Sequence, residues 1–264
     1  MEIRVFTSYY SIADPARKNE LIASIFENTQ CDSITKVCLY LENTDTPFSH
    51  PKLVTKTINQ RPKYIDFIDW ANELVTESND TTVICNSDIS FDKSIGACSR
   101  ALRPNECAAL ARWDLVKDGP PKLYYTPYAQ DAWIFSGKIR DIECNFNIGV
   151  SGCDNRFMHE LFKAGYNVIN PALSIRSYHR HDAPTRKYGD DSTKSVGPPY
   201  KGMYPHNLHN LPRTVWQNTL NKSEKQSWYF DWRLTKRSVR KLLIACKLIN
   251  PRKRNFPGNS LPPM

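Results

Sequence analysis

The chain has 264 residues, which can hold one large α/β domain or a domain plus an appendage. Its residues are 40% hydrophobic and 11% aromatic, which argues against wholesale disorder. No run of about 18 apolar residues occurs, so the sequence predicts no transmembrane helix, and the first residues lack the features of a secretory signal. The formal net charge of +9 belongs entirely to residues 233–264, which hold nine Lys or Arg residues and no acidic residue, leaving 27 of each sign before them. A neutral body argues against a broad nucleic-acid-binding face, and we expect no nucleic-acid partner.

The eight cysteines form no Cys-x-x-Cys pair, and several of them lie inside apolar runs. This pattern is typical of reduced, mostly buried thiols and not of a disulfide scaffold or a zinc site. We therefore expect a cytoplasmic protein. The basic tail leaves open a peripheral attachment to the inner face of a membrane.

The first 92 residues alternate between the patterns of strands and helices. In chain order, the expected elements are a strand at 3–10, a helix from Pro15, strands at 34–41 and 53–58, a helix at 64–75 and a strand at 81–85. Asp14 and Pro15 supply the cap and first turn that start a helix. This order predicts an α/β fold with a mostly parallel central sheet flanked by helices.

The rest of the chain is less regular. The expected elements are a strand or short helix at 107–115, strands at 132–135 and 145–150, a helix at 154–164, and late strands at 166–169 and 173–178. Residues 182–232 are rich in Pro, Gly, Asn and aromatic residues with little periodicity, which predicts an irregular lid or arm. Residues 234–249 have one apolar face and one face of Lys and Arg, which predicts a basic amphipathic helix. The helix either packs on the domain or lies, with the rest of residues 233–254, on an anionic membrane surface.

The most informative stretch is the buried strand at 81–85 and the polar residues Asn86, Ser87 and Asp88 that follow it. Polar groups at the carboxyl ends of strands lie where open α/β sheets bind their ligands. A carboxylate there can hold a divalent cation against a diphosphate. The alternative is an Asx turn, in which Asp88 only caps backbone amides.

Other polar groups follow strands or begin helices. Arg61 and Lys63 lie between a strand and a helix and either meet a phosphate or form an ordinary solvated loop. Asp131 stands at the start of an apolar strand. Asp154 follows Gly152 at the start of a helix, where it serves as an N-cap or as a catalytic carboxylate.

His179 and His181 close the late strand. Residues i and i+2 of a strand share a face, so both imidazoles can reach one metal ion. The alternative is a structural or exposed pair.

In this order, the motifs resemble those of the GT-A family of nucleotide-sugar glycosyltransferases, over roughly residues 1–190. Asn86-Ser87-Asp88 looks like the D-x-D motif of that family with Asn for its first Asp, and Gly152-Cys153-Asp154 looks like its x-E-D motif with Cys for Glu. His179 or His181 matches a late histidine of the family. The strings Arg112-Trp113-Asp114 and Gln130–Phe135 add a likeness to a little-described branch found in bacteria and large viruses.

The resemblance implies a Rossmann-like GT-A fold and an enzyme that moves a sugar from a nucleoside diphosphate sugar to a hydroxyl of a glycan or lipid-linked acceptor. It implies a catalytic domain at 1–181, with a nucleotide-binding half at 1–92 and an acceptor half at 93–181, followed by the arm at 182–232 and the tail at 233–264. Asp154 would be the base of an inverting reaction, with Asp131 in reserve. The remaining roles implied are donor binding by Thr7, Arg61, Lys63, Asn86, Ser87 and Asp88, and ligation of Mn²⁺ or Mg²⁺ by Asp88, His179 and His181.

Three alternatives remain open at this point, one of which is a nucleic-acid-binding protein that acts through the basic tail. Because both motifs depart from the family pattern, the chain can be a nucleotide-sugar-binding protein without transferase activity. The third alternative is a nucleotidyltransferase on a similar sheet, although that class uses a Gly-rich loop after the first strand, where this chain has Thr7-Ser8-Tyr9-Tyr10.

Overall fold

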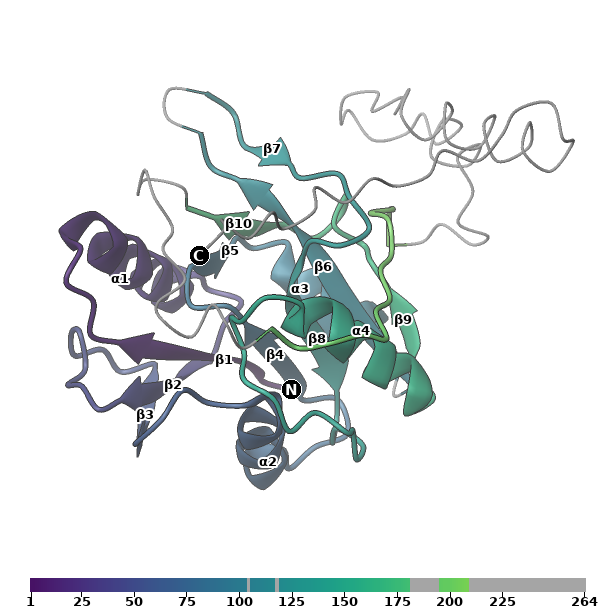
Figure 1. The fold of residues 1–264 in the computed structure, drawn as a ribbon, viewed down its shortest axis with the longest axis horizontal. Helices are drawn as coiled ribbons and strands as arrows, with labels where there is room; N and C mark the ends of the chain where they lie inside the picture. Colours follow the sequence, from purple (N-terminus) through teal and green to yellow (C-terminus); the bar gives the residue numbers. More distant parts are fainter. Residues whose placement is uncertain (104, 117–118, 181–194, 209–264) are drawn as a thin grey trace, which may run out of the picture. The chain divides into compact units, whose positions relative to one another are not determined.

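The structure, a computed structural model, describes residues 1–103, 105–116, 119–180 and 195–208, which lie in one compact unit, Met1–His209 (Figure 1). Residues 195–208 form no helix or strand. The rest of the predicted arm and the whole predicted basic helix lie outside the described residues. The division of the chain into catalytic domain, arm and tail therefore stays a prediction.

The first half of the chain forms the elements that the sequence predicts, with shifts of one or two residues at some ends. They are β1 (Ile3–Tyr10), α1 (Pro15–Gln30), β2 (Lys36–Glu42), β3 (Leu53–Ile58), α2 (Tyr64–Leu74) and β4 (Thr81–Cys85). The start of α1 follows the local signal, because the side chain of Asp14 accepts a hydrogen bond from the backbone N–H of Ala16 at 2.9 Å and Pro15 occupies the first turn.

The second half adds short elements that the sequence pattern does not reveal. Its elements are β5 (Ile89–Phe91), α3 (Ile95–Ala101), β6 (Glu106–Asp114), β7 (Lys122–Leu123), β8 (Gln130–Ser136), α4 (Cys153–Lys163), β9 (Asn167–Ile169) and β10 (Ser177–His179). The segment at 107–115, which the sequence leaves as strand or helix, is strand β6. Elements as short as β5, α3 and β7 contain too few residues to show a period.

The strand predicted at 145–150 does not form, and this prediction is wrong. The segment instead runs across the start of α2, where the N–H of Tyr64 donates to the carbonyl of Phe146 at 3.1 Å and the N–H of Ile148 donates to the carbonyl of Pro62 at 3.2 Å. A single bridge joins Lys63 and Asn147. Backbone groups of this segment, in which apolar residues alternate with Asn or Gly, are thus paired with the start of α2 instead of a neighbouring strand.

The strands form one mixed sheet in the order β3-β2-β1-β4-β8-β6-β10-β5, with β7 and β9 paired to β6. Strands β3, β2, β1 and β4 are parallel, and β6 is parallel to both β9 and β10. Strand β8 is antiparallel to β4 and to β6. The predicted α/β fold with a mostly parallel central sheet is confirmed.

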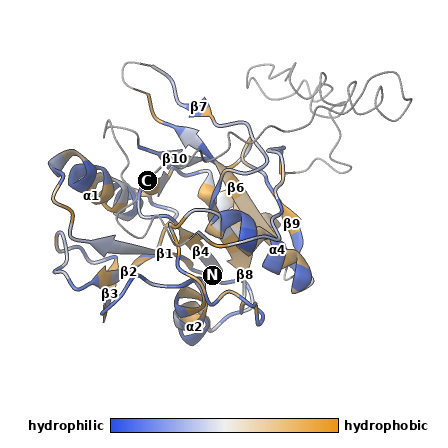
Figure 2. Cartoon of the chain, in the orientation of Figure 1, coloured by the Kyte–Doolittle hydropathy of each residue, from blue (hydrophilic) through white to orange (hydrophobic). Residues whose placement is uncertain are grey.

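Alternate residues of the strands supply two cores, one on each face of the sheet. On one face Phe6 and Trp133 pack with α2 and α4, and on the other Val5 and Ile134 pack with α1 and α3. Figure 2 shows hydrophobic colours along β6 and β8 and mixed colours on α1 and α2, as expected for inner strands between amphipathic helices.

The seven cysteines in the described ranges are free and all buried, and their burial confirms the sequence prediction. Burial raises the pKa of Cys38 and Cys144 to about 12, so these thiols stay protonated at neutral pH. Within the described ranges, none of the helices has the length and apolar character needed to cross a bilayer.

A buried ion pair ties β1 to the turn before β4. Arg4 donates from Nη1 to Oδ2 of Asp80 at 3.1 Å, and the backbone N–H of Glu2 donates to Oδ1 of Asp80 at 3.0 Å. Burial alone would raise the pKa of Asp80, but the hydrogen bonds from Glu2 and Arg4 outweigh it and lower this pKa below its ordinary value.

We predict that Asp80→Asn lowers the free energy of unfolding by about 1–3 kcal/mol at pH 7, because Arg4 loses its buried counter-charge and keeps only the partly exposed carboxylate of Glu2. A carboxylate with a lowered folded-state pKa stabilises above its unfolded pKa of about 3.9 and loses this effect as the pH falls through the folded value. Urea unfolding should therefore show a smaller difference between variant and wild type at pH 3 than at pH 7. The exposed Asp45→Asn is the control, and an equal loss at both pH values would contradict the prediction.

Candidate functional site

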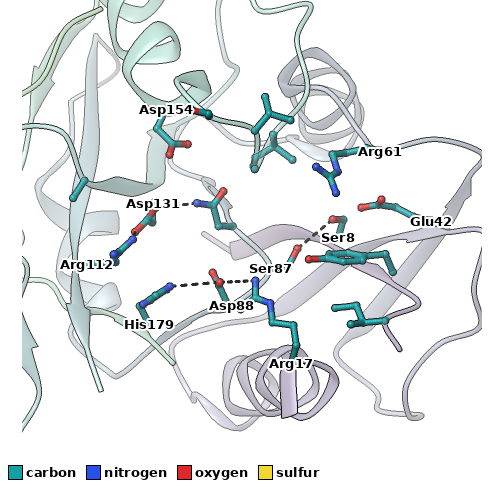
Figure 3. Close-up of a pocket in the computed structure, with 18 of the residues that line it drawn as sticks. Ser8, Arg17, Glu42, Arg61, Ser87, Asp88, Arg112, Asp131, Asp154 and His179 are labelled. Carbon is teal, nitrogen blue, oxygen red and sulfur yellow. Dashed lines mark hydrogen bonds and ion pairs between the residues drawn. The ribbon is translucent and has the colours of Figure 1, made fainter. Parts of the chain in front are cut away.

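A cleft of about 840 Å³ opens where the carboxyl ends of β1, β2 and β4 face α4 and the strands of the second half (Figure 3). Ser8 lies near the end of β1, Glu42 ends β2 and Ser87 follows β4. Asp131 of β8 and Asp154 of α4 line the opposite side. This is the edge at which open α/β sheets bind ligands.

Asp88 lies in the floor of the cleft, buried between two cationic or polar partners. Its Oδ2 accepts a hydrogen bond from Nη2 of Arg17 at 2.8 Å and lies 3.5 Å from Nε2 of His179. Arg17 is also paired with the buried Glu20, one turn along α1, at 2.6 Å. Asp88 is therefore an ion-pair partner in the cleft and not simply the cap of a turn.

His179 is oriented by a second carboxylate. Its Nδ1 lies 2.9 Å from Oδ1 of Asp114, so Nε2 is the nitrogen that faces Asp88. A metal-bound histidine has this arrangement, in which one ring nitrogen binds a carboxylate and the other is directed at the metal. Asp88 and His179 could thus serve as two ligands of a divalent cation. Oδ2 of Asp88, the oxygen that faces His179, also accepts the hydrogen bond from Arg17.

No group of three or more His, Cys, Asp or Glu side chains able to hold a metal ion occurs within residues 1–103, 105–116, 119–180 and 195–208. His181, the third predicted ligand, lies outside these ranges. A Mg²⁺ or Mn²⁺ ion that carries a diphosphate takes only one or two carboxylates from the protein and the remaining ligands from phosphate and water. Two protein ligands are consistent with an ion of that kind.

Asp131 is held on both oxygens. Asn86 donates from Nδ2 to its Oδ1 at 2.9 Å, and Arg112 donates from Nη1 to its Oδ2 at 3.1 Å. Burial, opposed by the charge of Arg112, raises the pKa of Asp131 above its ordinary value. The asparagine of the Asn86-Ser87-Asp88 motif therefore supplies a donor that an aspartate at this position would lack.

Asp154 lies at the start of α4, just after Gly152, whose φ of +80° is left-handed. A Cβ atom at Gly152 would come within 2.5 Å of the carbonyl oxygen of Val196, so glycine is required there. Oδ1 of Asp154 accepts hydrogen bonds from the hydroxyl of Tyr64 at 2.9 Å and from Sγ of Cys153 at 3.2 Å. Burial raises the pKa of Asp154 to about 7.

The far end of the cleft combines an aromatic ring, a cation and a carboxylate. Arg61 lies over the ring of Tyr10, with its guanidinium carbon 5.9 Å from the ring centroid. Burial raises the pKa of Glu42, while a hydrogen bond from Ser8 and the charge of Arg61 lower it. The hydroxyls of Ser8 and Ser87 lie 3.2 Å apart and connect this end to the floor of the cleft.

The structure brings most of the predicted site residues to this cleft. Those that line it are Arg61, Asn86, Ser87, Asp88, Asp131, Asp154 and His179. Thr7 is buried inside the sheet, and Lys63 bonds Asn145 through Nζ at 2.8 Å; neither lines the cleft. Their role in donor binding stays a prediction from the sequence.

The lining residues that were not predicted as site residues include Ser8, Tyr10, Arg17, Glu42 and Arg112. The strand-end rule that singles out Asp88 applies equally to Glu42 at the end of β2 and to Tyr10 at the end of β1. Arg112 belongs to a string that carries the family resemblance, without an assigned role. Arg17 has no local signal, because an arginine in the first turns of an amphipathic helix is ordinarily solvated.

Comparisons with known proteins give no matching family model and no matching curated protein. Among solved structures, the chain is similar to the mannosyltransferase PcManGT from Pyrobaculum calidifontis in complex with GDP-Man and Mn²⁺, at 13% identity and a TM-score of 0.46, over 71% of this chain and 58% of that one. It is similar to S. aureus TarS 1–349 in complex with UDP-GlcNAc, at 10% identity and a TM-score of 0.47, over 74% and 62% of the two chains.

A third similar structure is that of GalNAc-T7 with UDP, GalNAc and Mn²⁺, at 7% identity and a TM-score of 0.46, over 69% of this chain and 44% of that one. The chain covers at most 62% of the length of each of these three chains. At these identities and scores the likeness is one of fold only, and it assigns no role to any residue of this chain. The chemistry of the cleft follows from its own residues.

We predict that Asn86→Asp, which restores two acidic residues to the motif, destabilises the protein by about 1–3 kcal/mol at pH 8. It replaces the donor to Asp131 by a second carboxylate at hydrogen-bond distance, and like charges so close cannot both ionise without cost. Below about pH 5 the pair can share a proton and the loss should shrink. Chemical unfolding of Asn86→Asp and of the neutral control Asn86→Ser at both pH values checks this; a loss independent of pH would contradict it.

Proposed function

We propose that this cleft transfers a sugar from a nucleoside diphosphate sugar to a hydroxyl of a glycan or lipid-linked acceptor, with inversion at the anomeric carbon. The observation that carries the proposal is the placement of Asp154, a half-buried carboxyl with a pKa raised to about 7, across one cleft from the strand-end Asp88. A general base and a diphosphate site on opposite sides of a cleft are what an in-line displacement requires.

The donor would lie along the carboxyl ends of β1, β2 and β4. The ring of Tyr10 offers a surface for the nucleoside, and the carboxylate of Glu42 offers an acceptor for its hydroxyl or N–H donors. Arg61 lies beside both and can bind a phosphate oxygen. The diphosphate would then lie over Ser87 and Asp88, within reach of Arg17.

Charge in the cleft supports a divalent cation as cofactor. Among the lining residues that the structure describes, the carboxylates of Asp14, Glu42, Asp88, Asp131 and Asp154 outnumber the guanidinium groups of Arg17, Arg61 and Arg112. A diphosphate entering this cleft adds further negative charge. A Mn²⁺ or Mg²⁺ ion held by Asp88 and His179, and by His181 if it reaches the site, would neutralise the leaving diphosphate as a Lewis acid.

Asp154 is better suited than Asp131 to take a proton from the acceptor. Both oxygens of Asp131 are engaged by Asn86 and Arg112, whereas within the described ranges the hydrogen bonds to Asp154 all go to Oδ1. A carboxyl with a pKa near 7 is ionised in part at neutral pH and strongly basic for a carboxylate. Asp131 would position the acceptor or the sugar, with Arg112 beside it.

We predict that Asp154→Asn reduces sugar transfer by about 10²- to 10⁴-fold, the usual contribution of a general base, and leaves donor affinity nearly unchanged. The measurements are turnover at saturating donor and the donor Kd by calorimetry. Asp131→Asn is the comparison that tests the reserve assignment. Near-normal turnover in Asp154→Asn together with a large loss in Asp131→Asn would move the base to Asp131.

We predict that Asp88→Asn abolishes the gain in donor affinity that Mn²⁺ provides, because the amide loses the anionic oxygen that the ion requires. Donor binding would be titrated with and without Mn²⁺ in wild type and variant. Asp14→Asn is a matched control, since Asp14 lines the same cleft and asparagine is an equally good N-cap. An unchanged Mn²⁺ effect in Asp88→Asn would remove the metal from this proposal.

A screen of nucleotide sugars with and without Mn²⁺, followed by donor hydrolysis without acceptor, tests the proposed function as a whole. Slow release of sugar from a bound donor is expected of a transferase. Tight binding without hydrolysis or transfer would identify a nucleotide-sugar-binding protein instead. Release of pyrophosphate from a nucleoside triphosphate and a sugar phosphate would identify a nucleotidyltransferase.

A further inference from the structure

The cleft carboxylate of Asp154 depends on a tyrosine that does not line the cleft. Tyr64 begins α2 and is fully buried, and its hydroxyl donates to Oδ1 of Asp154 at 2.9 Å. Sγ of Cys153 lies 3.2 Å from the same oxygen and 3.7 Å from the hydroxyl of Tyr64. Within the described ranges, no hydrogen bond engages Oδ2 of Asp154, although the residue lines the cleft.

The hydroxyl of Tyr64 has a fixed position because its ring is clamped. The ring stacks on Phe157 of α4, with centroids 4.1 Å apart and planes at 17°, and Trp133 of β8 meets it edge-on at 5.1 Å. The N–H of Tyr64 also donates to the carbonyl of Phe146. Stacking on the helix that carries Asp154 keeps the hydroxyl in register with the carboxylate.

We infer that Tyr64 is a positioning residue for the reaction proposed above, which binds Oδ1 of Asp154 and thereby leaves Oδ2 directed at the acceptor hydroxyl. This inference rests on the proposed function. In this arrangement Oδ1 is fixed by hydrogen bonds from the protein, and Oδ2 accepts the proton from the acceptor hydroxyl. A preorganised base of this kind needs a donor whose own orientation is fixed by packing, as the ring of Tyr64 is.

The same contact governs how much of Asp154 is ionised. Burial raises the pKa of Asp154, and the charge of Asp131 on β8 raises it further. The hydrogen bonds from Cys153 on α4 and Tyr64 on α2, and the charge of Arg112 on β6, oppose this rise. Removing the donor of Tyr64 therefore favours the protonated carboxyl, which cannot act as a base at neutral pH.

The test is Tyr64→Phe, which keeps the stacked ring and removes only the hydroxyl. In the pH profile of turnover, the acidic limb should move up by about one pH unit, because a hydrogen bond to a charged group has about this effect on its ionisation. Activity should fall several-fold at pH 7 and recover toward pH 9. Tyr40→Phe is the matched control, since Tyr40 loses a hydroxyl in the same core that bonds only the backbone carbonyl of Asp66.

Titration of the Asp154 carboxyl carbon by NMR in wild type, Tyr64→Phe and Tyr40→Phe measures the contact without any transfer assay. An upward shift in Tyr64→Phe alone supports the inference, and an unshifted titration overturns it. Equal loss of turnover at every pH would also overturn it, since it would reduce Tyr64 to a structural residue. If wild type transfers no sugar, the proposed function fails, while the NMR titration still decides whether Tyr64 holds Asp154.

Discussion

The antiparallel pairing of β8 with β4 is the constraint on which the cleft depends. Because β8 runs opposite to β4, its first residues lie beside the last residues of β4, and the N–H of Asn86 donates to the carbonyl of Asp131 at 3.1 Å. In a fully parallel sheet, Asp131 would lie at the other edge. The reversal also brings Arg112 of β6, the next strand, to Oδ2 of Asp131. The reversed direction of β8 thus places Asp131 and Arg112 on the side of the cleft opposite β1 and β2.

The three central carboxylates of the cleft differ mainly in what holds them. Asp88 is paired with Arg17 and Asp131 with Arg112, so each has a guanidinium partner. Asp154 accepts only neutral donors in the described part of the chain, and its pKa rises to about 7. The charge of Arg112 opposes the rise in the pKa of Asp131 that burial causes, whereas no guanidinium bonds Asp154 in the described part of the chain, so their surroundings separate these two groups chemically.

The positive charge of Arg17 is paired with two carboxylates at the floor of the cleft. It lies between the buried Glu20 on its own helix and Asp88 on the strand end, and it shares Oδ2 of Asp88 with Nε2 of His179. A divalent cation bound at Asp88 would compete for that oxygen.

Local sequence determined the longer helices and strands, and it marked the strand end before Asp88 and the helix start at Asp154. Strands and helices follow from periods of two and 3.6 residues, and Asp88 and Asp154 stand out because each follows a local boundary, a buried strand or a glycine turn. Two predicted strands show the limit of this rule. The alternating segment at 145–150 pairs with a helix start instead of a strand edge, and of the strand predicted at 173–178 only residues 177 and 178 belong to β10.

Only the tertiary structure decided which side chains act on these carboxylates. Arg17 reaches Asp88 across 71 positions of the chain, and Tyr64 reaches Asp154 across 90. Neither residue has a local signal, because an arginine on a helix and a buried aromatic have the same pattern whether or not a carboxylate lies opposite. The partner, and with it the ionisation of each carboxylate, is set by how α1, α2 and α4 pack on the sheet.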